Sequence, residues 1–100
     1  MYMLREVFRA ERGRAPELVG ALQALDQWFE QAGYGNRRIY VDYTGPMDTV
    51  VYQWEVESLD QYFTMERDTF VEPDDETKNL IDTMNSNAAS GSKEIYELVQ

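Results

Sequence analysis

RIYVDYTGPMDTVVYQWEVESL, residues 38–59, contains two alternating segments on either side of a turn. Apolar and polar side chains alternate through 38–44, and the Gly-Pro-Met-Asp sequence at 45–48 is typical of a turn. The second segment, 49–57, is rich in β-branched and aromatic residues, which favour strands. One of its faces is entirely apolar: Val50, Tyr52, Trp54 and Val56. The stretch therefore predicts an antiparallel β-hairpin.

A helix is expected directly after the hairpin. Ser58 and Gln61 have the spacing of a capping box, in which each side chain satisfies a backbone amide at the start of a helix. Apolar residues then recur at helical spacing until Pro73, which interrupts the helix because it has no amide proton to donate. Asp74 can cap a further short helix.

The two ends of the chain supply the remaining strands. Residues 2–9, YMLREVFR, form a short aromatic and partly β-branched segment typical of a strand. Residues 85–92 are small and polar, so we expect a loop there. Residues 93–99 alternate again and predict the last strand.

One long helix is expected between the first strand and the hairpin. Pro16 suits the first turn of a helix, and Gly33 and Gly35 are placed to end it. Between them, apolar residues recur at spacings of four and three: Leu18, Leu22, Leu25, Phe29 and Ala32. This stripe predicts an amphipathic helix with one face in the core.

The element order β-α-β-β-α-β predicts an α+β fold of the ferredoxin-like type, with residues 1–100 forming one domain around a four-stranded antiparallel sheet. Right-handed crossovers place both helices on one face of that sheet. The strands offer large apolar residues in both alternations, so the other face needs a partner as well. A second copy is the simplest partner. We therefore expect a homodimer in which two sheets form a dimeric α/β barrel.

Composition narrows the range of functions. The chain has 19 acidic and 9 basic residues, a net charge of −10, which disfavours nucleic acids and anionic membranes as partners. It has no Cys and no His, and so lacks thiolate nucleophiles, the commonest general base and the commonest zinc and haem ligands. We therefore expect no metal and no cofactor. No apolar run is long enough to span a membrane, and we expect a cytoplasmic protein.

Four strand residues are candidates for a ligand site. Tyr52 and Trp54 share one face of the hairpin and could wall a cavity for an aromatic ligand, or pack against the helices. Arg5, in the middle of the first strand, could bind a carboxylate, or pair with a carboxylate such as Glu55. If Arg5 and Tyr40 face inward on neighbouring strands, the pocket would prefer planar anionic or weakly acidic ligands.

Residues 45–59, GPMDTVVYQWEVESL, resemble the hairpin and second-helix start of NIPSNAP-like proteins, which carry a Gly, an Asn-x-Val-Val-type strand, a Trp and then Glu-Ser-Leu. Residues 4–18 and 90–96 fit the same pattern, so the resemblance spans nearly the whole chain. Asp48 departs from it where the family often has Asn, and Tyr52 where His is common.

The resemblance implies a dimeric α/β barrel, a fold shared with antibiotic-biosynthesis monooxygenase domains, the second candidate family. The first loop is one residue longer than the family norm, so Arg5 and Glu6 compete for the inward position that an Arg tends to occupy. Haem-degrading members of the wider fold use a catalytic His, and because this chain has none, that activity is not carried over.

Three functions stay open. The first is a NIPSNAP-like domain that binds a small molecule, in a cavity between helices and sheet or between paired sheets. The second is a cofactor-free monooxygenase or isomerase of the antibiotic-biosynthesis monooxygenase type, in which Glu6, Asp42 or Glu55 could supply a general base if desolvated. The third is a self-associating structural module with no ligand.

Overall fold

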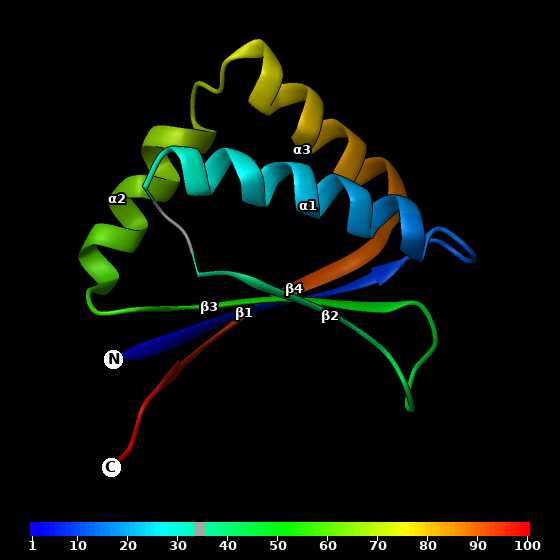
Figure 1. The fold of residues 1–100 in the computed structure, drawn as a ribbon, viewed down its shortest axis with the longest axis horizontal. Coiled ribbons are helices and arrows are strands. Elements are labelled where there is room, and N and C mark those ends of the chain that lie inside the picture. The colour runs from blue at the N-terminus through cyan, green and yellow to red at the C-terminus, as the bar shows by residue number, and fades with distance from the viewer. Residues whose placement is uncertain (34–35) are drawn as a thin grey trace.

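The fold is built on one four-stranded antiparallel sheet, with strand order β2-β3-β1-β4 and the helices on one of its faces (Figure 1). The computed structural model describes residues 1–33 and 36–100. Its elements are β1 (Tyr2–Ala10), α1 (Ala15–Gln31), β2 (Arg38–Val41), β3 (Thr49–Val56), α2 (Leu59–Phe70), α3 (Asp75–Asn87) and β4 (Ala88–Glu97). The expected ferredoxin-like α+β fold is confirmed, with α3 as the additional helix that Asp74 caps.

Helix α1 lies along the sheet and supplies much of the core. Its expected apolar stripe is buried from Leu18 to Phe29. Ala32 was expected to continue that stripe, but it lies past the end of the helix and is exposed. Gly33 follows with a φ of 91°, a left-handed conformation that Gly adopts readily. Gly35, the second expected helix terminator, lies outside the described residues.

Helix α2 begins as its sequence predicts. The Ser58 side chain accepts a hydrogen bond from the Gln61 amide, with 3.2 Å between Oγ and N. Tyr62 and Met65 are buried beneath the helix, whereas Phe63 and Phe70 are partly exposed. After the break, the Asp74 carboxylate accepts from the Thr77 amide and starts α3.

The prediction of a loop over residues 85–92 is wrong. Helix α3 continues to Asn87, whose side-chain amide donates to the Thr83 carbonyl in the last turn, and β4 begins at the next residue. Gly91, one of the small residues that suggested a loop, makes room for packing on β1. A Cβ atom at Gly91 would stand 3.0 Å from Cδ1 of Phe8, its cross-strand partner. The strand therefore starts at Ala88 rather than Lys93.

The hairpin strand expected over residues 38–44 is shorter than predicted and ends at Val41. Asp42 then closes the hairpin onto Thr49, because its backbone amide donates to the Thr49 carbonyl and its carboxylate accepts from the Thr49 amide. Tyr43 follows in the turn and is fully exposed.

The sheet face opposite the helices is left open by the described part of the chain (Figure 1). Strand alternation places on it the residues next to the core positions of each strand. They include Met3, Arg5, Val7, Tyr40, Val51 and Tyr96, together with the polar or charged Arg38, Gln53, Glu55 and Glu94. Val51 is 9% exposed and Tyr40 45%, so the face combines a covered centre with exposed aromatic edges. The pairing of two such faces into a barrel stays a prediction.

Candidate functional site

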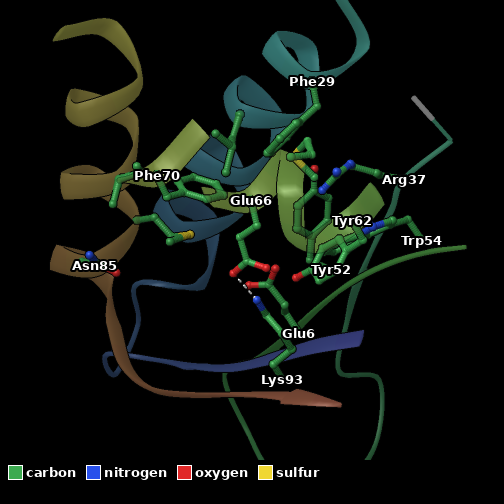
Figure 2. Close-up of a pocket in the computed structure, with 14 residues that line it drawn as sticks. Glu6, Phe29, Arg37, Tyr52, Trp54, Tyr62, Glu66, Phe70, Asn85 and Lys93 are labelled. Atoms are coloured by element: carbon green, nitrogen blue, oxygen red, sulfur yellow. Dashed lines mark hydrogen bonds and ion pairs between the residues drawn. The ribbon is translucent and has the colours of Figure 1, made fainter. Parts of the chain in front are cut away.

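A cavity of about 280 Å³ lies between the helices and the sheet. Its walls are mostly aromatic and include Phe29, Tyr52, Trp54, Tyr62 and Phe70. Its polar groups are few, and the charged ones are Glu6, Arg37, Glu66 and Lys93 (Figure 2). An apolar pocket with a small number of polar groups is the usual form of a small-molecule site.

A row of three side chains across the sheet forms one wall of the cavity. Lys93 of β4 is the cross-strand partner of Glu6, and Glu6 is the cross-strand partner of Tyr52 on β3. Glu6 alternates with Leu4 and Phe8 along β1, and because both of these are buried in the core, Glu6 shares their direction. All three residues of the row line the cavity.

The two glutamates of the cavity are in opposite electrostatic situations. Burial raises the pKa of Glu6, and the nearby Glu66 charge raises it further, against the opposing charges of Lys93 and Arg37. Burial also acts to raise the pKa of Glu66, but hydrogen bonds with Lys93 and Tyr62 and the charge of Lys93 outweigh it and lower that pKa. A site with two carboxyl groups whose pKa values are pushed apart can hold one neutral and one ionised.

Lys93 and Glu66 form an ion pair between β4 and α2. The Lys93 ammonium donates a short hydrogen bond to Oε1 of Glu66 (Figure 2), and the side chains are 34% and 30% exposed. The Lys93 Nζ also lies 5.3 Å from the centre of the Tyr62 ring. The pair therefore connects the edge strand to α2 at the margin of the cavity.

Arg37 contributes a positive charge among aromatic rings. Its guanidinium carbon lies 3.8 Å from the centre of the Phe29 ring, 4.0 Å from that of Trp54 and 5.5 Å from that of Tyr52. These distances are those of cation–π contacts. Arg37 thus places a positive charge at the cavity wall.

Tyr52 is held in the wall by its hydroxyl group. The hydroxyl donates to Oδ1 of Asp26 on α1, with 3.1 Å between the oxygens. Burial and the neighbouring Asp26 raise the pKa of Tyr52, so the phenol stays neutral at physiological pH. The Tyr52 ring is tilted against that of Trp54, with 5.3 Å between ring centres.

The structure separates the four expected site residues onto two faces of the sheet. Tyr52 and Trp54 line the cavity under the helices. Arg5 and Tyr40 lie on the open face, and because β3 lies between β1 and β2, they are not on neighbouring strands. Glu6, not Arg5, points into the cavity. Among the described residues no ion pair joins Arg5 to Glu55, and the Arg5 Nε is buried without a hydrogen-bond partner.

Three charged residues of the cavity were not recognised as site residues from the sequence. Glu66 recurs at helical spacing with Tyr62 and Phe70, and a charge within an apolar stripe could have marked it. Lys93 lies two residues before Ile95, so strand alternation places both on the same face. Arg37 lies in a loop, where no periodic pattern marks it.

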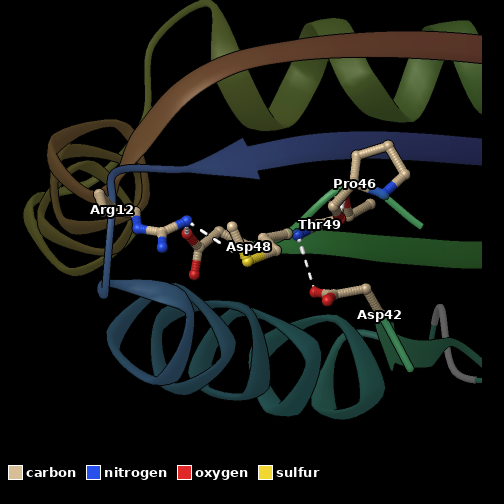
Figure 3. Close-up of polar contacts among 6 residues, drawn as sticks. Arg12, Asp42, Pro46, Asp48 and Thr49 are labelled. Carbon is tan, nitrogen blue, oxygen red and sulfur yellow. Dashed lines mark hydrogen bonds and ion pairs between the residues drawn. The ribbon is translucent and has the colours of Figure 1, made fainter. Parts of the chain in front are cut away.

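Asp48, where the sequence departs from the NIPSNAP-like pattern, lies in the hairpin turn and not among the residues of the cavity (Figure 3). Its φ is 63°, a left-handed conformation that Asp and Asn tolerate better than most residues. Arg12 of the β1–α1 loop lies 3.7 Å from its carboxylate, and Thr49 donates to the Pro46 carbonyl at 2.7 Å. The role of Asp48 is therefore in the turn.

Two wider features of the described residues bear on function. No group of three or more acidic, His or Cys side chains is arranged there to hold a metal ion. None of the helices they form has both the length and the apolar character needed to cross a membrane.

The chain has the fold of several solved structures. No protein-family model and no curated protein matches it in sequence. A NIPSNAP family protein from Agrobacterium tumefaciens superposes with a TM-score of 0.80 at 19% identity, over 98% of this chain and 92% of that one. An uncharacterized NIPSNAP domain protein from Burkholderia xenovorans gives 0.76 at 14%, over 99% and 95%. An antibiotic biosynthesis monooxygenase gives 0.74 at 12%, over all of both chains. The expected resemblance is confirmed at the level of the fold.

Proposed function

We propose that this chain, which shares its fold with NIPSNAP family proteins and an antibiotic biosynthesis monooxygenase, is a small-molecule-binding domain. The ligand site is the cavity between the helices and the sheet. The observation that carries the proposal is the combination of aromatic walls with a carboxyl group, Glu6, that makes no hydrogen bond among the described residues. Tyr52 and Trp54 supply apolar contact area, the main source of affinity in such pockets.

The charges of the cavity favour a weakly acidic or carboxylated ligand. The Glu66 and Lys93 charges offset each other in their ion pair. Arg37 adds a guanidinium to the cavity wall beside the Phe29 ring, where it can attract the negative charge of a ligand. The volume of about 280 Å³ lies near the lower end of ligand pockets, so we expect a small planar ring system.

Thermal shift and calorimetric titration with 2-naphthoate, 2-naphthol and heptanoate test the proposal. We expect the two bicyclic aromatic compounds to raise the melting temperature, and heptanoate to have little effect. Met84 lines the cavity and Met47 is 58% exposed in the hairpin turn, so Met84→Trp and Met47→Trp form a matched pair. Met84→Trp should weaken binding about tenfold or more by filling the cavity, and Met47→Trp should not. Equal binding by both variants would contradict the proposal.

An enzymatic function is the second candidate. The observation in its favour is that Glu6 and Glu66 share the cavity with pKa values shifted in opposite directions, as in many acid–base sites. Of the chemistries expected for the antibiotic-biosynthesis monooxygenase type, this arrangement favours isomerisation, because proton transfer needs only carboxyl groups. Turnover of a bound compound that is lost when a cavity carboxyl group is replaced would support an enzyme rather than a binding domain.

Self-association is proposed for the open face of the sheet. Val7 and Val51 form its apolar centre, and Tyr40 and Tyr96 are each 45% exposed beside it. Arg5, a candidate ligand residue, belongs to this face. A second copy covering it would offer an acceptor to the buried Arg5 Nε, which has none among the described residues. It would also complete a dimeric barrel without blocking the cavity on the other side of the sheet.

A further inference from the structure

The Glu6 carboxyl has no hydrogen-bond or ion-pair partner among the described residues, unlike Glu66 and Tyr52 beside it. Glu66 accepts from Lys93, and Tyr52 donates to Asp26, so these groups are engaged. The Glu6 carboxyl lines the cavity between Lys93 and Tyr52 and, within the described residues, makes neither a hydrogen bond nor an ion pair. A carboxyl placed in this way can reach a bound molecule without first breaking a contact.

We infer that Glu6 is the proton-transfer residue of a cofactor-free tautomerisation or isomerisation of a small aromatic ketone or enol held in the cavity. This inference rests on the proposed ligand site and adds a reaction to it. The aromatic walls fit the ring of such a compound, and the cations Lys93 and Arg37 line the same cavity as Glu6.

The step is balanced within the substrate and Glu6. The Glu6 carboxylate takes a proton from the carbon next to the carbonyl group, so that a C–H bond breaks and an O–H bond forms. The electron pair moves through a new C=C bond to the carbonyl oxygen, which becomes an enolate. Neutral Glu6 then returns the proton to the enolate oxygen, which gives the enol, or to that carbon or a conjugated one. The carboxylate is regenerated, and no oxidant or reductant is consumed.

The surroundings of Glu6 suit this role. Burial makes its carboxylate more basic than an exposed one, which strengthens a general base near neutral pH. Lys93 and Arg37 act on the site with positive charge and can offset that of an enolate. The titratable or charged groups that face Glu6 from the packed elements are Lys93, Tyr52, Tyr62, Glu66 and Arg37.

Deuterium exchange into 2-tetralone, a bicyclic aromatic ketone, tests the inference directly. The C–H bonds next to its carbonyl exchange with D2O, and proton NMR follows the loss of signal. We expect the unmodified protein to accelerate exchange, and Glu6→Gln to reduce the acceleration about a hundredfold, within the usual range for a general base. Glu30→Gln, the same change at an exposed residue of α1, should accelerate the exchange of 2-tetralone as much as the unmodified protein does. The accelerated rate should rise with pH through the raised pKa of Glu6.

The outcomes separate this inference from the proposed function. If 2-tetralone shifts the melting temperature but exchanges equally fast with Glu6→Gln, Glu6 is not the base and only the binding proposal survives. If 2-tetralone and the aromatic acids leave both the melting temperature and the exchange rate unchanged, the ligand site itself is wrong. Circular dichroism confirms that Glu6→Gln is folded, and Glu6→Asp, which keeps the carboxyl but draws it back, should retain part of the rate.

Discussion

Glu6 and Lys93 are direct cross-strand partners on β1 and β4, yet the Lys93 ammonium bonds to Glu66 of α2 and not to Glu6. The ion pair thus connects a helix to the sheet, and the Glu6 carboxyl beside it lines the aromatic cavity with no ion-pair partner in the part of the chain that the structure describes. This arrangement underlies both the electrostatics of the site and the chemistry inferred for it.

Replacement of Glu6 by Gln should stabilise the protein at pH 8. Because burial raises the pKa of Glu6 above its ordinary 4.5, the folded state holds the proton more tightly than the unfolded state. Stability from this group is therefore complete below the ordinary pKa and is lost as the pH rises through the raised one. We expect urea unfolding of Glu6→Gln at pH 8 to give a free energy about 1 kcal/mol higher than that of the unmodified protein. If Glu6→Gln were less stable than the unmodified protein by the same amount at pH 4 and pH 8, ionised Glu6 would not be destabilising.

Replacement of Lys93 by Met should raise the pKa of Glu66. The hydrogen bond and charge of Lys93 help to lower that pKa, and the same charge opposes the rise at Glu6. Carbon-detected NMR titration of the glutamate carboxyls should therefore show both pKa values moving upward. Lys78→Met, at an exposed position of α3, is the control and should move neither. The pair is partly exposed, so its loss should cost no more than about 1 kcal/mol of stability.

Two glycine substitutions should have opposite effects on stability. Gly91→Ala places a Cβ atom 3.0 Å from the Phe8 ring, and we expect a loss of about 1–2 kcal/mol from overpacking. Gly20→Ala lies within α1 with open space around it, and the better helix propensity of Ala should add about 0.5–1 kcal/mol. Urea denaturation measures both. A stabilising Gly91→Ala would mean that Phe8 and β4 are less closely packed than described.

The open face of the sheet should hold two copies together. Light scattering after gel filtration should give about twice the chain mass of 11.7 kDa. Val7→Asp, at the centre of that face, should give a folded monomer, because a buried unpaired charge disfavours the interface. Val99→Asp, at a residue that is 87% exposed, should remain a dimer. A monomeric unmodified protein at micromolar concentration would exclude this interface.

Much of the fold could be predicted from local pattern. The apolar alternation of residues 49–57 and the spacing of Ser58 and Gln61 are local signals, and the structure confirms the strand and the helix start. The prediction of a loop at 85–92 was wrong because Gly and Ser usually mark turns, whereas here Gly91 makes room for the Phe8 ring on the neighbouring strand.

The site was less predictable because its geometry depends on contacts distant in sequence. Residues 2–9 carry apolar side chains on both faces, so only their register with β3 and β4 shows that Glu6 and not Arg5 points under the helices. Arg37 reaches the rings of Phe29 and Trp54 from a loop, a contact that no periodicity encodes. Tyr52 and Trp54 could be predicted as site residues because large aromatic residues on one strand face suit either a core or a cavity wall. In the structure they belong to the core and also line the cavity.

The methionine methyl groups offer the most direct test of the cavity as the ligand site. Met65 and Met84 line it, whereas Met3 lies on the open face and Met47 in the hairpin turn. In protein labelled with 13C at the methionine methyls and titrated with 2-naphthoate, we predict saturable shifts of the Met65 and Met84 signals with one dissociation constant, while Met3 and Met47 stay unchanged. Binding that shifts Met3 and leaves Met65 and Met84 in place would contradict the account.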